Sequence, residues 1–345
     1  MRFSVRPHRA ITYSWVVVAF AVAGALAPAS STAASDPARP SAARTASPAA
    51  AAAAWVNGRI AFSQWDLLPG GNLSGHSNVY TISPGGSGRR QLTHVGTAQA
   101  AGAPDWSPGG AKIAYESNQT GAYRIWVMNA DGSGQRRLTD DPGFTDLLPS
   151  WSPDGTRILF SRCTEQPGGS GCDLVVMNAV GGGMRRLAGG HWTWVRGQYS
   201  PDGRRIVVGA DRGGLLSALW VMRADGTGLH RITRASLQAF WPGWSPDGRR
   251  IVFTDNCCQF GSNIWTVRRN GKGLRKLTHF APPPLQGGFA SYSPDGRRIV
   301  LQYNGKCPAR GICRYFYVMN ADGSGLHPVR TGVPNTFLTD WGPAG

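Results

Sequence analysis

Carboxylates are the side chains to consider first, because acid–base catalysis in hydrolases and lyases needs a pair of them at one site. The 345-residue chain has only 19 acidic residues, and just two of them, Glu116 and Glu165, are glutamates. Seven aspartates stand in repeated turns, where a bond from the side chain to the backbone is a sufficient role. A catalytic site would need one of the other acids to approach Arg196 or a histidine. The candidates for that role are Asp140, Asp141, Asp146 and Glu165.

Other catalytic signatures are missing from the sequence. The seven histidines show none of the paired spacings that zinc ligands use, although His94, His191 and His279 fall in loops that could converge. No Gly-x-Ser-x-Gly nucleophile elbow occurs. We therefore predict that the chain is not an enzyme and that it uses no metal and no cofactor.

One segment recurs along the chain, an aromatic residue followed by Ser-Pro and then by Asp-Gly or Gly-Gly. Pro presets φ, Asp bonds back to the backbone and Gly accepts positive φ, so the segment predicts a tight turn. One β-rich run precedes each turn and three follow it, the last two joined by a second turn such as Ala-Asp-Gly. Four antiparallel strands per repeat are typical of a β-propeller blade. The repeated aromatic residues lie 45–49 positions apart and are Trp106, Trp151, Tyr199, Trp244, Tyr292 and Trp341.

The number of blades follows from how the repeats begin and end. The first repeat starts near Trp55 and contains three of the four strands, without the aromatic strand. The segment around Asp340 and Trp341 supplies that strand from the other end of the sequence. Joining the two closes the ring and removes exposed sheet edges. We predict an all-β fold, a six-bladed β-propeller over residues 55–345 closed by its C-terminal strand.

These motifs carry a family resemblance. Trp-Ser-Pro-Asp-Gly-x-x-Ile-x-Phe, then Trp-Val-Met-Asn-Ala-Asp-Gly, then Arg-Leu-Thr, resembles the PD40 repeat of TolB-like propellers, over residues 55–345. The resemblance implies the six-bladed fold. It says less about function, because such propellers serve as envelope partners, as extracellular binding proteins and as non-catalytic halves of peptidases. The extra N-terminal α/β domain of TolB has no counterpart in the Ala-rich segment of this chain.

The two faces of such a propeller would differ in chemistry. The repeated turns would lie on one face, and the variable connections, with all six cysteines, on the other. Loops on a rigid scaffold are common recognition sites. Aromatic rings on this loop face could stack on sugars or hold a Pro-rich peptide, or they could instead plug the channel. The predicted ligand-binding residues are Trp192, Trp194, Arg196, Phe240, Trp241, Phe280, Phe289, Asp141 and Asp146.

The opposite face is predicted to be basic. The formal net charge is +17, and several arginines fall in the repeated turns. A ring of them could attract anionic wall polymers, acidic lipids or nucleic acid, or it could simply be a soluble face that every repeat inherits. No nucleic-acid-binding motif occurs, and export argues against DNA. The residues of this basic face are Arg204, Arg205, Arg249, Arg250, Arg297 and Arg298.

Cysteine spacing and the N-terminus both indicate export. Cys163 with Cys172, and Cys307 with Cys313, bracket short loops and are predicted to form disulfides. The adjacent Cys257 and Cys258 could bond to each other, bond elsewhere or stay reduced.

Residues 1–29 have the arginines, apolar stretch and small residues of a signal peptide, with uncleaved anchoring as the alternative. Residues 30–54, rich in Ala, Ser and Pro, are predicted to be a disordered linker. We expect a secreted or envelope-associated monomer with no membrane span after cleavage.

The function predicted from the sequence is therefore that of an extracytoplasmic binding or scaffold propeller. It would recognise a protein, a peptide or a cell-envelope glycan through the loop face. One alternative is a hydrolase or lyase with a site in the central channel, which a cluster of carboxylates deep in the channel would favour. Another is a structural envelope component that binds anionic polymers through the basic face.

Overall fold

The computed structural model describes most of the chain after its first 57 residues. Contacts divide the chain into two units, Met1–Thr45 and Ala46–Gly345, and every described residue belongs to the second. The predicted signal peptide and linker lie outside the described residues. Among the described residues, no helix is long and apolar enough to cross a membrane. The described ranges are 58–67, 73–164, 171–189, 192–212, 217–255, 262–280, 286–306, 312–329 and 336–343.

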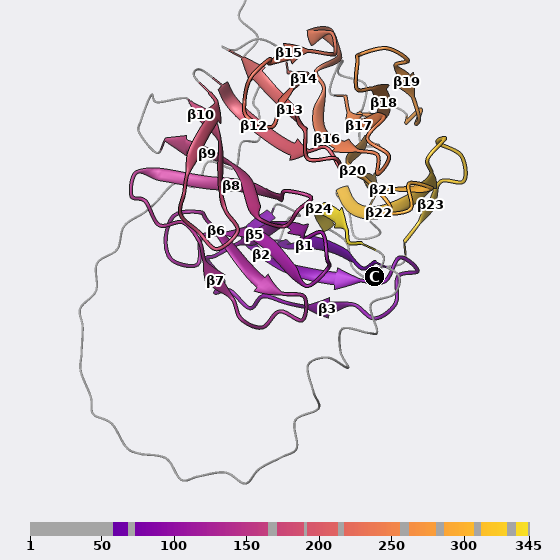
Figure 1. Cartoon of the computed structure of the whole chain (residues 1–345). Helices are drawn as coiled ribbons and strands as arrows, with labels where there is room; N and C mark the ends of the chain where they lie inside the picture. The colour runs from indigo at the N-terminus through magenta and orange to yellow at the C-terminus, as the bar shows by residue number, and fades with distance from the viewer. Residues whose placement is uncertain are drawn as a thin grey trace, which may run out of the picture. The chain divides into compact units, whose positions relative to one another are not determined.

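Six four-stranded antiparallel sheets build the second unit, and each is one blade of a β-propeller (Figure 1). Blade 1 consists of β24 (Thr336–Trp341), β1 (Ile60–Leu67), β2 (Leu73–Ile82) and β3 (Arg90–Gln91). Blade 2 consists of β4 (Ala101–Trp106), β5 (Lys112–Ser117), β6 (Arg124–Asn129) and β7 (Arg136–Arg137). Blade 3 consists of β8 (Phe144–Trp151), β9 (Arg157–Thr164), β10 (Cys172–Asn178) and β11 (Arg185–Ala188).

The remaining blades repeat this order. Blade 4 consists of β12 (Trp192–Tyr199), β13 (Arg205–Arg212), β14 (Ala218–Arg223) and β15 (His230–Arg231). Blade 5 consists of β16 (Phe240–Trp244), β17 (Arg250–Thr254), β18 (Ile264–Arg268) and β19 (Arg275–Lys276), preceded by the short 3-10 helix η1 (Ala235–Leu237). Blade 6 consists of β20 (Gln286–Tyr292), β21 (Arg298–Lys306), β22 (Ile312–Asn320) and β23 (His327–Pro328).

Blade 1 is assembled from both ends of the sequence, as predicted. β24 pairs antiparallel with β1, with Trp341 opposite Ile60, and Figure 1 shows the two strands side by side. The Gly342 backbone N–H donates to the Arg59 carbonyl at 2.9 Å, which is the bond that closes the equivalent turn in other blades. The first strands of successive blades contact one another from β24 through β4, β8, β12, β16 and β20 and back to β24. The ring is thereby closed.

The hydrophobic core lies between neighbouring blades. Ile125 and Val127 of blade 2, for example, pack in one cluster with Phe160 of blade 3. Because a blade has a neighbour on each side, its second strand is buried on both faces: Ile158, Leu159 and Phe160 are all fully buried. Such strands therefore read as continuous apolar runs rather than as an apolar–polar alternation. The repeated aromatic residue belongs to this inter-blade core, since Trp151 is only 7% exposed.

Turn aspartates have the structural role that the sequence predicted. In the turn after β8, Asp154 Oδ1 accepts hydrogen bonds from the Ser152 hydroxyl at 2.5 Å and from the Thr156 backbone N–H at 3.0 Å. These bonds, led by the one from Ser152, lower the pKa of the Asp154 carboxyl. Gly155 completes the turn with a φ of +69°. The carboxylates of these turns are therefore engaged within their own loops.

A disulfide joins Cys163 of β9 to Cys172 of β10, where the two residues are directly opposite each other. The second predicted disulfide, between Cys307 and Cys313, lies outside the described residues, since Cys307 and the side chain of Cys313 are not described. Cys257 and Cys258 are not described either.

Replacing both Cys163 and Cys172 with serine is expected to lower the free energy of unfolding by about 2–3 kcal/mol, since the bond closes a short loop in the unfolded chain. Urea denaturation would measure the change. Reduced wild type is the control, and an unchanged midpoint in both would contradict the expectation.

Candidate functional site

Four of the inner strands carry the same strained bulge, three residues before the repeated aromatic. Ala103, Leu148, Trp241 and Phe289 stand at this position with φ between +46° and +56°. Each lies where the register with the second strand shifts. Positive φ is costly for residues other than glycine, above all for bulky ones, and such strain is often found at functional sites. The bulge bends the strand and redirects its side chains where the strand borders the central channel of the propeller.

Blade 4 departs from this pattern and contributes an arginine. Its register shift comes earlier, between Trp192 and Trp194, so that Arg196 pairs regularly with Gly209 of β13. Arg196 nevertheless occupies the position that Trp241 and Phe289 occupy in blades 5 and 6. The three side chains line a small cavity of about 10 Å³ in the channel.

These three residues form what we call the Arg196 platform. The Arg196 guanidinium carbon lies 5.0 Å from the centre of the Trp241 ring, within cation–π range. The Trp241 and Phe289 ring centres are 4.3 Å apart. Within the described part of the chain, no hydrogen bond or ion pair shorter than 4 Å involves the guanidinium of Arg196. Its N–H donors therefore have no protein acceptor among those residues, and the side chain lines the small cavity.

Three carboxyl groups surround this arginine. The charges of Asp105, Asp340 and Glu116 each favour the protonated Arg196, although burial lowers its pKa overall. Blade 1, which carries Asp340, is opposite blade 4 in the ring, so the interaction crosses the channel. Glu116, Asp340 and Arg196 each retain some accessible surface.

Burial raises the pKa of all three carboxyl groups. For Asp105 the pKa rises well above its ordinary value, through burial first and the neighbouring Asp340 charge second. Burial likewise raises the pKa of Asp340, against a backbone hydrogen bond and the Arg196 charge. Burial raises the pKa of Glu116 to about 7, although its Oε2 accepts a hydrogen bond from the Leu148 backbone N–H at 2.7 Å. Glu116 therefore keeps its proton to a higher pH than an exposed glutamate would.

Several of these polar groups also join neighbouring blades. Asp340 Oδ2 accepts a hydrogen bond from the backbone N–H of Trp106 in the next blade at 2.8 Å, and Asp105 Oδ2 accepts one from Trp151 at 2.8 Å. Gln198 Oε1 likewise accepts a hydrogen bond from the backbone N–H of Trp244 at 3.1 Å. All three stand immediately before a repeated aromatic, a place that we call the clamp position. The residues at the clamp position are Asp105, Ser150, Gln198, Gly243, Ser291 and Asp340.

A larger hollow of about 260 Å³ opens where the repeated Ser-Pro turns surround the channel, and we call it the turn-face hollow. All six repeated aromatics and the prolines of the turns line it. Five of the six clamp residues, all except Gly243, line it as well. Gln198, Ser291 and Asp340 also line the small cavity beside the Arg196 platform. The two spaces therefore lie along one channel.

Only part of the predicted aromatic face reaches this channel. Arg196, Trp241 and Phe289 do, as described. Trp192 is instead 1% exposed and packs in the core between blades 3 and 4. Phe280 packs on Tyr303 with ring centres 4.8 Å apart. Phe240 is partly buried opposite Thr254, and the side chain of Trp194 lies outside the described residues.

The acids that the sequence offered as catalytic candidates are engaged elsewhere. Asp141 and Asp146 both bind Arg162, at 2.6 and 2.7 Å. Asp140 lies 3.3 Å from Arg137. Glu165 is outside the described residues. The acids that do approach Arg196 are ones that sequence reasoning missed, and the available signal was that two of the six clamp positions hold Asp where the others hold Ser, Gln or Gly.

The basic face is less uniform than the sequence suggested. Arg204, Arg249 and Arg297 are exposed, but each follows a turn aspartate whose pKa is lowered and which stays charged at neutral pH. Arg298 lies over the Trp341 ring, 5.4 Å from its centre. Arg205 and Arg250 are partly buried. The rim around the turn-face hollow is therefore of mixed charge with an excess of arginine.

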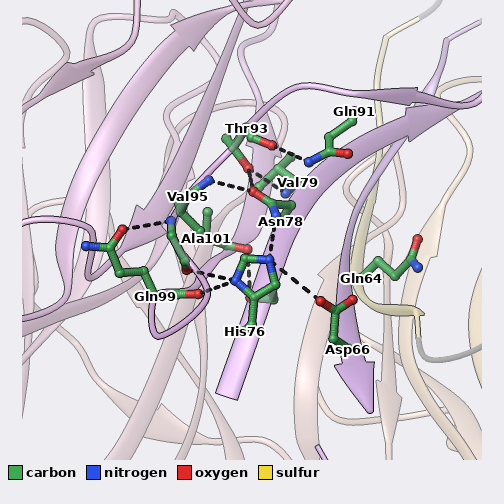
Figure 2. Close-up of polar contacts among 12 residues, drawn as sticks. Gln64, Asp66, His76, Asn78, Val79, Gln91, Thr93, Val95, Gln99 and Ala101 are labelled. Atoms are coloured by element: carbon green, nitrogen blue, oxygen red, sulfur yellow. Dashed lines mark hydrogen bonds and ion pairs between the residues drawn. The ribbon is translucent and has the colours of Figure 1, made fainter. Parts of the chain in front are cut away.

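A polar network in blade 1 is the other conspicuous cluster, and Figure 2 shows it. His76 Nδ1 lies 2.9 Å from the Gly96 carbonyl oxygen, so it carries the proton, and Nε2 then accepts from the Asn78 side-chain amide at 3.1 Å. Asn78 Oδ1 in turn accepts from the Thr93 hydroxyl at 2.9 Å. Both nitrogens of His76 are thus engaged, and Asp66 approaches it only to 3.7 Å. The network ties loops together and leaves no imidazole nitrogen for chemistry.

The described residues contain no group of three or more His, Cys, Asp or Glu side chains placed to bind a metal ion.

Known proteins share this fold and parts of this sequence. An uncharacterized protein of Agrobacterium fabrum is 31% identical over 133 residues, which cover 36% of this chain and 44% of that protein. The matches to curated relatives cover less than half of each relative's length. The crystal structure of TolB from Acinetobacter baumannii superposes with a TM-score of 0.68 at 20% identity, covering 84% of this chain and 67% of that one.

An oligogalacturonate lyase from Vibrio parahaemolyticus superposes with a TM-score of 0.51 at 15% identity, covering 74% of this chain and 71% of the lyase. At such identities the two structural matches show the fold alone. A family model described as the TolB beta propeller domain, PD40, matches residues 73–279, which is more than half of the sequence. The chain therefore belongs to the PD40 family of TolB β-propellers.

Proposed function

We propose that the chain is an exported binding propeller that holds a segment of a partner protein or peptide on the Arg196 platform. The observation that carries the proposal is the guanidinium stacked on Trp241 with no hydrogen-bond acceptor among the described residues. Planar N–H donors over an aromatic ring suit peptide carbonyl groups and a flat apolar side chain. A cell-envelope glycan is the alternative ligand of the same surface, and export rests on the N-terminal sequence pattern.

The narrowness of the channel favours contact at its opening over passage through it. The cavity beside Arg196, Trp241 and Phe289 has a volume of about 10 Å³, which is room for about one water molecule. A partner would therefore rest on the platform rather than pass it. Strain at Trp241 and Phe289 is consistent with side chains held in place for binding.

Capture from isolated envelope fractions tests the proposal, with the full chain as bait and the captured protein identified by mass spectrometry. Arg196→Gln removes the cation, and Trp241→Asn removes the ring while keeping a residue that tolerates positive φ. With the purified partner, each is expected to weaken binding at least about tenfold, the range of a central interface residue. The matched control is Phe280→Leu, which removes an aromatic ring that packs on Tyr303 away from the platform.

Salt separates the outcomes of this experiment. Capture that persists in high salt and is lost in both platform variants supports the proposal. Capture that salt abolishes and the variants retain would contradict it and would leave the exposed arginines of the rim as the working surface. Equal affinity of the two variants and the wild type would also contradict it.

A hydrolase or lyase acting in the channel is the second candidate, and the raised pKa of Glu116 favours it. A carboxyl group with a pKa of about 7 is suited to general acid–base catalysis. Against it, Glu116 and both channel aspartates already accept backbone hydrogen bonds. Assays on envelope glycans and on oligogalacturonate would decide, and turnover that Glu116→Gln removes would establish the enzyme in place of the binding propeller.

A further inference from the structure

The turn-face hollow is lined by polar side-chain atoms that have no hydrogen-bond partner among the described residues. Ser150 is 3% exposed and Asp105 is 5% exposed, and both line the hollow. Among the described residues, the Ser150 hydroxyl has no hydrogen-bond partner, and Asp105 uses only Oδ2, for the Trp151 backbone N–H. These atoms keep accessible surface in the hollow, where bound water or a ligand can supply the missing hydrogen bonds. The Arg196 platform consists of other residues, although Gln198 also borders the small cavity beside it.

The clamp position makes these groups rigid. Asp105 and Gln198 are each held at one side-chain oxygen by a backbone N–H of the next blade. Because Gln198 Oε1 is the acceptor in that bond, its Nε2 is the group left over, and it has no partner among the described residues. Ser150 sits at the same position in the blade between them. The hollow thus presents a preorganised carboxyl group, a hydroxyl and an amide donor from three successive blades.

Charge on both sides of the hollow selects against ions. A cationic ligand would be repelled by the Arg196 guanidinium farther along the channel and by the exposed Arg204, Arg249 and Arg297 of the turns. An anionic ligand would lie against Asp105 and Asp340, which line the hollow directly, in a place where burial already disfavours negative charge. A neutral ligand with several hydroxyl groups meets neither penalty and can both donate and accept.

Size and lining narrow the class further. The volume of about 260 Å³ is below the roughly 300–1,000 Å³ of sites for drug-sized ligands, so a single ring fits better than a polymer segment. Six aromatic residues line the hollow, each with the 6–7% of its surface that stays exposed, and this adds apolar surface that sugar C–H groups can contact. We propose that the turn-face hollow binds one neutral sugar unit, whose hydroxyls take the places of the missing partners of Asp105, Ser150 and Gln198.

The test is saturation-transfer NMR on the full chain with glucose, galactose, mannose and N-acetylglucosamine. Glucosamine and galacturonic acid serve as charged analogues, and short neutral oligosaccharides separate a free monosaccharide from the terminal unit of a glycan. Ser150→Ala removes the free hydroxyl. Gln198→Glu keeps the oxygen that accepts from Trp244 and replaces only the free amide donor. Both variants are first compared with the wild type in thermal melting, so that a folding defect is recognised.

We expect at least one neutral sugar to bind, with each variant weakening it about tenfold, the effect of losing one buried hydrogen bond. Trp241→Asn, which alters the Arg196 platform, is expected to leave sugar binding unchanged, so failure of the proposed partner site and failure of this site are distinguishable. No signal from any neutral sugar overturns the proposal and leaves bound water as the occupant. Binding that the two folded variants retain, or tighter binding of a charged analogue, overturns it as well.

Discussion

Deletion of residues 336–345 is expected to abolish the cooperative unfolding transition of the propeller. The deletion removes β24, so β1 becomes an exposed edge. It also removes Trp341, which packs with Phe62 and Val300 in the cluster between blades 1 and 6, and Asp340, which clamps blade 1 to Trp106 of blade 2. Loss of a buried tryptophan alone costs about 3–5 kcal/mol, a large part of the roughly 5–15 kcal/mol that stabilises a typical domain. Calorimetry and urea denaturation would show the loss.

A circular permutant is the matched control for this deletion. In it, residues 336–343 precede Gly58 through an Asp-Gly linker, which copies the turn of the other blades because Gly342 already donates to Arg59. If the strand itself closes the ring, the permutant recovers a cooperative transition. A deletion variant that still unfolds cooperatively, with a midpoint near that of the wild type, would contradict the prediction.

Glu116→Gln is expected to stabilise the protein above pH 7 and to change little near pH 4. The folded pKa of Glu116, about 7, is above its ordinary value of 4.5. The folded state therefore holds the proton more tightly than the unfolded state, so Glu116 makes wild-type stability fall as pH rises from about 4.5 to 7. Glutamine keeps an oxygen for the Leu148 N–H and has no proton to lose. The shift of about 2.5 pKa units corresponds to a gain of up to about 3 kcal/mol at pH 8.

Urea denaturation of both proteins between pH 4 and pH 8 measures this difference. Some decline remains in the variant, because burial also raises the pKa values of Asp105 and Asp340. Asp225→Asn is the control of opposite sign: hydrogen bonds from Thr227 lower the pKa of Asp225 below its ordinary value of 3.8, so the stabilisation from its charge is lost only below this pH range. This variant is therefore expected to be less stable than the wild type by a nearly constant amount from pH 4 to pH 8. Parallel curves for Glu116→Gln and the wild type would show that Glu116 is solvated like an exposed carboxylate.

The sequence by itself determined the blades, their number and the closure of the ring. The reason is that these features depend on local chemistry repeated at a constant spacing. Each Ser-Pro-Asp-Gly turn closes through its own side chains, as Asp154 does, and needs no distant partner. The first repeat lacks its aromatic strand, and the segment around Trp341 is an extra one. Only one pairing joins them, and β24 does pair with β1 in the structure. Cys163 and Cys172 were likewise predictable because a short loop brings them together.

Only the tertiary structure decided which side chains meet in the channel. Trp192 is the first residue of β12 and Trp241 is the second residue of β16, yet Trp192 enters the core and Trp241 lines the channel. Relative to the repeated aromatic residue, the register shift of the first strand comes earlier in blade 4 than in blade 5. The residue spacing did not predict this difference. Arg196, Asp105, Glu116 and Asp340 come from three blades and lie up to 235 positions apart in the sequence. Their contact, and the pKa values that follow from it, depend on blades closing around one axis and excluding water.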